Sequence, residues 1–496
     1  MGCGRMKINR FHVLLFITWQ LTIYFAVQQL FSIFSNYTPK WRCSNDTEYA
    51  KNCTLLKECP KELLQFDHMP FYSTVLEFDM LCGTRAYIAS LISTFQFCGV
   101  LLGTIVFGQL ADKYGRRPIA LITLTFGVFF TMLSGASPNW QILMALRILV
   151  GTCIGGAIVS LYTYVVEIIP PQQRVFLRAF FNWGYSRVML TIVCWMIPHW
   201  RWASYATVSF VVPLIPIIYF LLPESPTWLM SKERFTEMEQ SEQKISKYAN
   251  SPTMFEAQNS QEKKVLKPQR QYTIRDLFAN RLIAKRTLIL WLIWFTAALC
   301  SYVNDLNSRN LAGDFFANQL LMGSMTGMCQ AIIYLLDTYI PGFSRRMLYQ
   351  ASQSLVIGCF ATMTLLMIFV DAPIVILVID LVGTVLISYT WDACFLCAAE
   401  GFPTEVRAMG IGTCASISRI GALLAPQVAF LGTLWQPIPF LTVFLLGTIS
   451  LSFSIIFLPE TKGTDLKKCS EILTTNVKSS KVHPVADTSG QQKMDC

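Results

Sequence analysis

The stretch Glu167 to Arg174, EIIPPQQR, recurs near the other end of the chain as Glu400 to Arg407, EGFPTEVR. The two copies are 233 residues apart (400 minus 167). A second motif keeps nearly the same spacing, because LPES at 222–225 returns as LPET at 458–461. An internal repeat of this size predicts a chain built from two similar halves.

Long apolar blocks surround these motifs. Of the 496 residues, 53% are hydrophobic and only 14% are charged, whereas soluble proteins carry about 25% charged residues. About 20 residues of helix cross the hydrocarbon core of a bilayer, and a backbone in lipid must satisfy its own hydrogen bonds. The sequence therefore predicts an all-α membrane protein with twelve transmembrane helices, six in each half. The expected spans are 11–34, 86–111, 118–136, 140–161, 175–197, 202–222, 286–304, 315–337, 347–370, 372–397, 408–431 and 436–458.

The basic residues predict the orientation of these helices. Most Lys and Arg fall on the face that holds both termini, and basic residues accumulate in cytoplasmic loops. Both termini are therefore expected to be cytoplasmic, and the net charge of +10 follows from this sidedness rather than from nucleic-acid binding. The expected parts are an N-terminus (1–10), an N-terminal half (11–222), a cytoplasmic linker (223–285), a C-terminal half (286–458) and a cytoplasmic tail (459–496).

The loop at 35–85 is expected to face the outside. It holds four cysteines, an even number that allows three disulfide pairings, in a space that permits disulfides. It also holds three Asn-x-Thr sequons, which are glycosylated only on the outer side. The cysteines are Cys43, Cys53, Cys59 and Cys82, and the sequon asparagines are Asn36, Asn45 and Asn52.

Charges inside membrane helices are the strongest pointers to function, because each costs about 3 kcal/mol or more unless it is paired or hydrated. The expected spans contain three arginines and two well-embedded acids. Adding the repeat offset to the position of Arg147 gives Asp380, and Arg187 is similarly related to Arg419. The embedded residues are Arg147, Arg187, Arg419, Asp380 and Asp392.

Arg187 and Arg419 form the candidate substrate site. We expect them to face a central cavity from opposite halves and to bind the carboxylate or sulfonate of an organic anion or zwitterion, because a guanidinium grips a carboxylate in bidentate fashion. The structural alternative is that Arg419 pairs with Asp392, while Arg187 extends toward the membrane surface or pairs with another residue. Arg147, beside several glycines, is expected at the cavity wall with Asp380, although a purely structural role is the alternative.

Asp392 supports a different reading of the site. Tyr389 and Trp391 flank this acid, and aromatic rings beside a carboxylate suit an organic cation through cation–π contact. A coupling proton is another candidate ligand for Asp392. Trp and Tyr in membrane helices also serve as packing residues and interface anchors.

The cytoplasmic motifs predict a latch of ion pairs at helix ends. Gly115 allows a tight turn between an acid that ends one helix and two arginines that begin the next. Ion pairs of this kind would hold one conformation shut during alternating access, whereas the alternative is that the arginines only set topology. The second copy is stretched and contains Pro341. The latch candidates are Asp112, Gly115, Arg116, Arg117, Glu167 and Arg174 in the first half, and Asp337, Arg345, Glu400 and Arg407 in the second.

Several of these motifs resemble those of the major facilitator superfamily. The loop GQLADKYGRR at 108–117 and Arg147 with the glycines after it are similar to its signatures. EFDMLC at 77–82, LAGD at 311–314 and PTEVR at 403–407 resemble the organic ion branch, which covers cation, anion and carnitine carriers. The resemblance implies a solute site near mid-membrane between the halves. It also implies that a basic residue in the eleventh helix, here Arg419, is typical of anion and carnitine carriers.

The expected function is therefore transport of a small organic ion across a membrane, and the expected membrane is the plasma membrane. No nucleotide-binding loop and no hydrolytic or metal-ligand cluster is evident, so we expect no enzyme activity, no metal and no cofactor. The expected partners are the organic ion, the lipid bilayer and a coupling ion, either a proton or a counter-substrate. The alternatives are a cation carrier, a sugar porter of the same fold, and a receptor or scaffold derived from a transporter.

Overall fold

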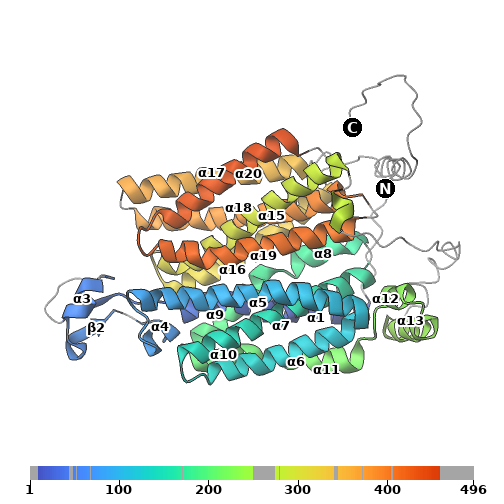
Figure 1. The fold of residues 1–496 in the computed structure, drawn as a ribbon, viewed down its shortest axis with the longest axis horizontal. Helices are drawn as coiled ribbons and strands as arrows, with labels where there is room; N and C mark the ends of the chain where they lie inside the picture. The colour runs from blue at the N-terminus through green and yellow to red at the C-terminus, as the bar shows by residue number, and fades with distance from the viewer. Residues whose placement is uncertain are drawn as a thin grey trace.

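The computed structural model describes residues 9–43, 49–51, 53–67, 69–169, 171–249, 274–278, 280–339, 345–370, 372–403 and 406–458. Within these ranges the chain forms two bundles of long helices that lie side by side (Figure 1). The N-terminal half contains α1 (Arg10–Ala26), η1 (Val27–Gln29), α2 (Phe31–Ser35), α5 (Thr84–Tyr114), α6 (Arg116–Gly135), α7 (Trp140–Ile168), α8 (Pro171–Phe180), α9 (Trp183–Met196), α10 (Trp200–Ser209), α11 (Leu214–Pro216) and η3 (Ile217–Leu221). The C-terminal half contains η4 (Ile274–Leu277), α15 (Arg281–Asn307), η5 (Ser308–Asn310), α16 (Phe315–Tyr339), α17 (Arg345–Phe369), α18 (Pro373–Gly401), α19 (Arg407–Leu431) and α20 (Ile438–Phe457).

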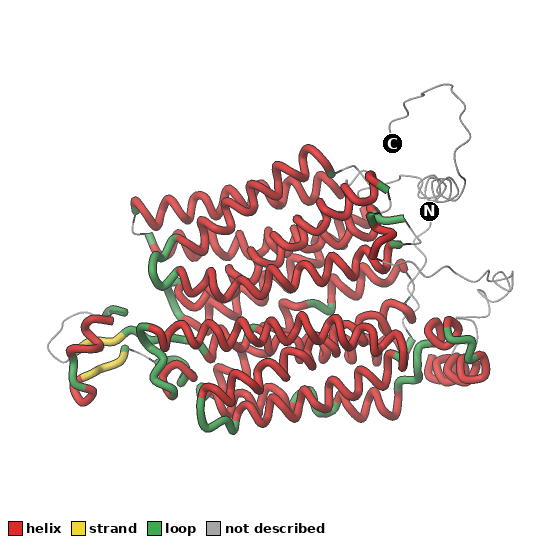
Figure 2. The backbone as a smooth tube through the Cα atoms, in the orientation of Figure 1, coloured by secondary structure: helices red, strands yellow, loops and turns green. Residues whose placement is uncertain are grey.

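Two small structures mark the opposite ends of the bundle (Figure 2). The first is a two-stranded antiparallel sheet of β1 (Trp41–Cys43) and β2 (Leu64–Phe66), accompanied by α3 (Cys53–Glu58), η2 (Lys61–Leu63) and α4 (Thr74–Glu77). The second is a helical pair in the linker, α12 (Pro226–Ser231) and α13 (Phe235–Ala249). We call these the hairpin end and the linker end. Sequence charge predicts that the hairpin end is extracellular and the linker end cytoplasmic.

Ten helical segments among the described residues are long and apolar enough to cross a membrane. The expected spans at 175–197 and 315–337 are not among them. The first is interrupted at Phe181 and Asn182, where the Asn182 side chain accepts hydrogen bonds from the backbone N–H groups of Gly184 and Tyr185 and starts α9. The second is the 25-residue helix α16. The expectation of uninterrupted helices is therefore wrong for α8 and α9.

Close helix contacts within each half depend on small residues. A Cβ atom built on Gly151 of α7 would lie 2.1 Å from the backbone oxygen of Gln96 in α5. Only glycine permits this approach of two helix backbones. The glycines that follow Arg147 thus bring α5 and α7 together and hold the N-terminal half as one body.

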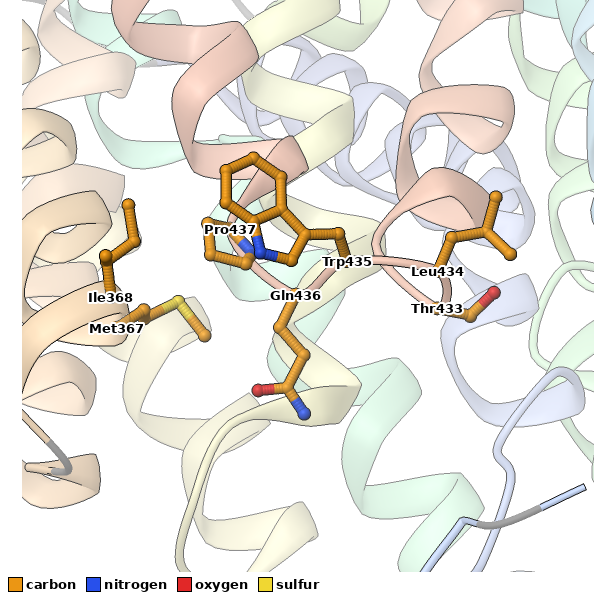
Figure 3. A pocket seen from close by; sticks show the side chains of 7 residues that line it. All are labelled: Met367, Ile368, Thr433, Leu434, Trp435, Gln436 and Pro437. Carbon is orange, nitrogen blue, oxygen red and sulfur yellow. The ribbon is translucent and has the colours of Figure 1, made fainter.

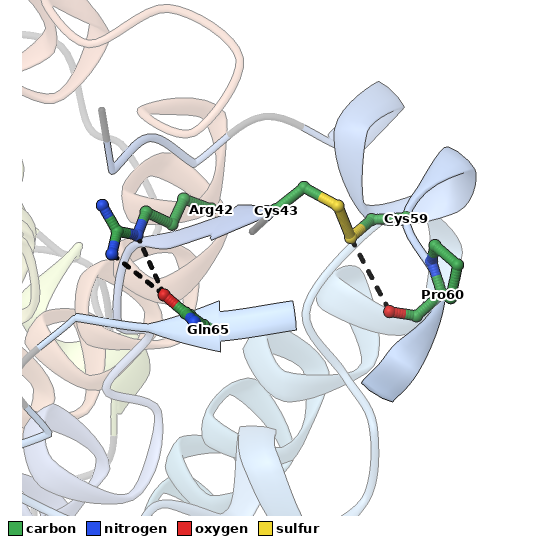
Figure 4. Close-up of a disulfide and its surroundings, with 5 residues drawn as sticks. All are labelled: Arg42, Cys43, Cys59, Pro60 and Gln65. Carbon is green, nitrogen blue, oxygen red and sulfur yellow. Dashed lines mark hydrogen bonds between the residues drawn. A yellow bond between two sulfur atoms is a disulfide. The ribbon is translucent and has the colours of Figure 1, made fainter. Parts of the chain in front are cut away.

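The loop at 35–85 contains two disulfides, Cys43–Cys59, which is drawn in Figure 4, and Cys53–Cys82. The structure thereby selects one of the three pairings that the sequence left open. Asn36 is buried, and its side-chain nitrogen donates hydrogen bonds to the Ala89 carbonyl at 3.0 Å and the Ser93 hydroxyl at 2.9 Å. A glycan on Asn36 would have to displace at least one of these hydrogen bonds, and its glycosylation stays a prediction. Asn45 and Asn52 lie outside the described residues, so their glycosylation stays a prediction.

Candidate transport site between the two halves

Arg187 of α9 joins the two halves inside the bundle. Its Nη1 donates to Asp305 Oδ1 of α15 at 2.6 Å, and its Nη2 donates to Gln319 Oε1 of α16 at 2.6 Å. The side chain is 5% exposed, and its Nε has no partner among the described residues. Arg187 therefore faces the C-terminal half as expected, but it does so as one member of a buried ion pair.

Asp305 and Arg178 are embedded charges that the sequence analysis missed. The expected seventh span ended at residue 304, whereas α15 continues to Asn307 and places Asp305 in the helix. Arg178 lies in α8 and falls inside the expected fifth span, 175–197, but was not counted among the embedded charges. With these two, the embedded charges singled out among the described residues are Arg147, Arg178, Arg187 and Arg419 and the aspartates Asp305, Asp380 and Asp392. The expected surplus of one positive charge remains, but the count of three against two was wrong.

Arg419 of α19 is the half-buried arginine at the interface. Its Nε is buried and has no hydrogen-bond partner, and the described residues offer it no carboxylate within ion-pair distance. Its guanidinium interacts with the hydroxyl of Tyr302, which itself donates to Gln29 Oε1 at 3.3 Å. Because Gln29 lies in η1 of the N-terminal half, Tyr302 links Arg419 to the facing half.

Asp392 has a partner that was not foreseen. Arg178 Nη2 donates to Asp392 Oδ1 at 2.9 Å, and the same guanidinium lies 4.1 Å from the centre of the Phe395 ring. The alternative in which Arg419 pairs with Asp392 is therefore wrong in this conformation. The neighbouring aromatic residues are engaged as well, since Tyr389 donates to the Cys329 carbonyl and Trp391 packs edge-on against Trp294.

The symmetry-related residues Arg147 and Asp380 are both buried, and neither has an ion-pair partner within the described ranges. The Arg147 guanidinium lies 5.0 Å from the centre of the Phe31 ring. Asp380 Oδ2 has no hydrogen-bond partner, but the carboxyl lies close enough to Arg187 and Asp305 to interact with them electrostatically. The repeat thus places unpaired charges of opposite sign at matching positions in the two halves.

At the linker end, the first predicted latch is assembled within the N-terminal half. Arg116 pairs with Asp112 at 2.6 Å and with Glu167 at 3.1 Å. The Ser225 hydroxyl donates to Glu167, and Trp228 of α12 donates to the Asp112 carbonyl. Gly115 has φ +113°, a conformation that requires glycine. This network ties α5, α6 and α7 to the start of the linker.

Glu224 holds the same corner, although the sequence analysis did not single it out. Its carboxylate accepts hydrogen bonds from the backbone N–H groups of Arg116, Arg117 and Ser225 at 2.9–3.2 Å. Burial raises the pKa of Glu224, and these N–H groups oppose that rise. Arg117 donates to the carbonyls of Ile218 and Tyr219 and so anchors the end of η3.

The second latch is also present in part. Arg345 at the start of α17 pairs with Glu400 of α18 at 3.1 Å, the same distance that separates Arg116 from Glu167 in the first half. Arg407 donates to the Phe402 carbonyl. The side chains of Arg174 and Asp337 lie outside the described residues, so their roles stay predictions. The pairs seen at both sites join helices of one half rather than the two halves.

Contact between the halves at the linker side is instead made by Arg178 and Asp392. We expect Arg178→Asp to reduce uptake about tenfold or more, because it leaves two facing carboxylates in a low-dielectric interface. The charge swap Arg178→Asp with Asp392→Arg is expected to recover part of the loss. Reversal of the exposed pair Arg234–Glu237 serves as the control, since surface pairs contribute at most about 1 kcal/mol. Initial uptake rates normalised to surface expression compare these three variants with wild type, and a swap no better than Arg178→Asp would contradict the assignment.

Two surface cavities lie away from this interface. One, of about 440 Å³, lies at the hairpin end of the C-terminal half and is lined by Met367, Ile368 and residues 433–437, with Trp435 across its centre (Figure 3). The other, of about 390 Å³, lies at the linker end against Trp228 and Glu224. Neither is lined by the embedded charges of the interface, so neither coincides with the candidate transport site.

Comparison with known proteins settles the family. The family model described as sugar (and other) transporter matches residues 19–473. The chain belongs to the major facilitator superfamily. This transporter is 41% identical to an uncharacterised protein of Caenorhabditis elegans over 93% of this chain and 94% of that protein. It is 30% identical to the organic cation transporter-like protein of Drosophila melanogaster, over 78% of this chain and 70% of that protein.

Further comparisons place the transporter in the organic ion family and define its fold. It is 28% identical to the human organic cation/carnitine transporter 2, over 81% of this chain and 72% of that protein. The inward-open xylose transporter XylE of E. coli superimposes with a TM-score of 0.67, covering 93% of this chain and 99% of that one at 15% identity. This likeness establishes the major facilitator fold alone. The transporter is thus a multi-pass membrane protein of a transporter family, as the sequence predicted, and it is not an enzyme.

Proposed function

We propose that this transporter moves small organic ions by alternating access and that it prefers anions or zwitterions over simple cations. The observation that carries the preference is Arg419, a guanidinium at the interface of the halves with no carboxylate partner among the described residues. An arginine remains charged and binds a carboxylate through two parallel hydrogen bonds. A substrate carboxylate would supply the missing partner.

The proposal gives Arg187 a secondary role at the site. Both of its terminal nitrogens already donate, to Asp305 and Gln319, so a substrate must displace one of these acceptors to reach it. Arg419 is therefore the primary anion contact, and Arg187 joins it only after the two halves have moved. In this scheme the pairs Arg116–Glu167 and Arg345–Glu400 keep each half rigid at the linker end.

Organic cations are the second candidate substrates, and the names of two relatives favour them. A cation would use the carboxylates Asp380 and Asp392 together with Tyr389 and Trp391. However, Asp392 is neutralised by Arg178 in this conformation. A zwitterion satisfies both observations, because its carboxylate would meet Arg419 while its cationic group remains near the acids.

The decisive experiment compares uptake of anionic, zwitterionic and cationic probes by wild type, Arg419→Lys and Arg419→Ala. We expect Arg419→Ala to reduce anion and zwitterion uptake about tenfold to a hundredfold, since a hydrogen bond to a charged group contributes about 1.5–3 kcal/mol. Arg419→Lys should retain an intermediate rate. Arg85→Ala, which removes an exposed arginine at the hairpin end, is the control.

Unchanged anion uptake by Arg419→Ala would refute the assignment of this residue. A loss confined to cationic probes would favour the cation reading. If wild type in reconstituted vesicles showed no saturable flux of any probe in a chemically broad panel, the transport proposal itself would fail in favour of a receptor or scaffold. Competition by hexoses rather than organic ions would instead indicate a sugar porter.

A further inference from the structure

Three ionisable side chains meet near the hairpin side of the interface, and their charges do not balance. Arg187 belongs to the N-terminal half, whereas Asp305 and Asp380 belong to the C-terminal half. Arg187 is hydrogen-bonded to Asp305 at 2.6 Å, while Asp380 has no ion pair. One guanidinium therefore faces two carboxyl groups and neutralises only one of them.

The surroundings of Asp380 do not supply a second positive charge. Among the groups on neighbouring elements, Arg187 of α9, Asp305 of α15 and Cys359 of α17 interact with Asp380 electrostatically. Arg419 of α19 interacts with Tyr302 instead, and Cys329 of α16 lies beside Tyr389. Within the described residues, Asp380 is thus approached by one arginine that is already paired and by two groups that are acidic or neutral.

Two buried oxygen atoms in this region lack hydrogen-bond donors. Asp380 Oδ2 has no partner, and neither has Asn304 Oδ1 on the facing helix α15, although both side chains are at least 97% buried. The two helices are joined here, because Asn304 Nδ2 donates to the Thr384 hydroxyl at 2.8 Å and that hydroxyl donates to the Asp380 carbonyl at 2.9 Å. A protonated carboxyl group buried here needs one hydrogen-bond acceptor for its O–H, whereas an ionised carboxylate needs several hydrogen-bond donors.

We propose that Asp380 is the site at which this transporter binds a coupling proton. The proton adds to a carboxylate oxygen of Asp380 from one side of the membrane and leaves the same oxygen toward the other side, so that charge and atoms balance over a cycle. Arg187 controls the exchange because it lies on the other half. When the halves reorient, its distance to Asp305 and Asp380 changes, and with it the number of protons that the two carboxyl groups retain.

This inference rests on the proposed function, because a coupled proton requires a transported solute. It also differs from the sequence-based expectation, which placed a coupling proton at Asp392. Asp392 is paired with Arg178 and therefore already neutralised. Asp380 is buried and lacks such a partner among the described residues, so protonation of its carboxylate removes a charge that no neighbouring cation neutralises.

The test uses proteoliposomes that contain the full-length transporter, with the membrane voltage clamped at zero. The probe is the organic ion that wild type transports fastest in the panel described above. We expect wild type to accumulate the probe about tenfold for each pH unit of an inwardly directed proton gradient, if one proton and the probe cross together as a neutral complex. Asp380→Asn, which imitates the protonated carboxyl, should accumulate nothing above equilibrium, and whatever probe exchange it retains should be insensitive to the proton gradient.

Asp314→Asn is the matched control. Asp314 is exposed at the hairpin end, where it accepts a hydrogen bond from the Ala317 backbone N–H at the start of α16, and asparagine caps helices as well as aspartate does. This variant should accumulate the probe like wild type. Proton-driven accumulation by Asp380→Asn would overturn the proposal, and so would accumulation in wild type that follows a sodium gradient and ignores the proton gradient.

A second measurement separates this proposal from the proposed function. Infrared difference spectra of the purified protein, recorded between acidic and alkaline pH, should contain a carboxylic-acid C=O band that disappears in Asp380→Asn and persists in Asp314→Asn. The measurement needs no substrate, so it supports the proton site even if no probe in the panel is transported. A band unchanged in Asp380→Asn would refute the site whatever the transport assays show.

Discussion

Arg187→Gln is expected to lower the free energy of unfolding by about 3–5 kcal/mol, because removing one member of a buried ion pair leaves the other charged and without a partner. The side chains of Arg187 and Asp305 are 5% and 12% exposed, so water does not replace the lost contact. Glutamine can still donate to Gln319 but cannot neutralise Asp305. Thermal unfolding of the detergent-purified protein measures the effect, with transport of the best probe as the second readout.

The double variant Arg187→Gln with Asp305→Asn tests the cause of this loss. Because it removes both charges together, it should recover most of the unfolding temperature lost by Arg187→Gln alone, although transport should remain impaired. A double variant as unstable as the single one would show that packing around Arg187, rather than its charge, stabilises the interface. Equal stability of wild type and Arg187→Gln would contradict the buried pair itself.

Gly184→Ala is expected to reduce transport by about tenfold or more while leaving each half folded. A Cβ atom on Gly184 of α9 would lie 2.4 Å from the Gly327 nitrogen and 2.6 Å from the Gly323 oxygen, both backbone atoms of α16 in the other half. Overpacking of this kind typically costs about 1–3 kcal/mol, and it would be relieved by separating the halves. The variant should therefore shift the population toward conformations in which α9 and α16 are apart.

Gly412→Ala provides the matched comparison, because a Cβ atom on this helical glycine of α19 meets nothing within 4 Å. It should transport like wild type and be equally or slightly more stable, since alanine favours helix over glycine by about 1 kcal/mol. Initial uptake rates and unfolding temperatures of both variants make the comparison. Normal transport by Gly184→Ala would show that the close approach of α9 and α16 is not needed for the transport cycle.

The repeat and the apolar blocks predicted the fold well because both are properties of whole segments. Hydrophobic length predicted two bundles of membrane helices, and the motifs around Arg116 and Arg345 predicted ion pairs at matching corners. Local interruptions were not predicted. The break at Phe181 and Asn182 depends on the Asn182 side chain, which caps the start of α9 inside the bundle. The apolar residues around Asn182 predict a continuous helix instead.

The candidate site was predicted only in part, because pairing depends on helix boundaries and on contacts between halves. The expected seventh span ended one residue before Asp305, so this acid was not counted. Because Asp305 pairs with Arg187, that arginine is not the free substrate contact that the sequence predicted. Arg178 lay inside the expected fifth span but was not counted as embedded, because it is only three residues from the cytoplasmic start of that span. A scan for acids within a helical turn of each expected span would have found Asp305, whereas its pairing with Arg187 requires the tertiary structure.

The interruption between α8 and α9 has a mechanical consequence. Each of the two short rods carries one arginine that crosses to the opposite half, Arg178 on α8 and Arg187 on α9. In a continuous helix the two arginines would move together, and breaking one ion pair would strain the other. The interruption at Phe181 and Asn182 lets α8 and α9 move separately, so that one ion pair between the halves can break while the other stays intact.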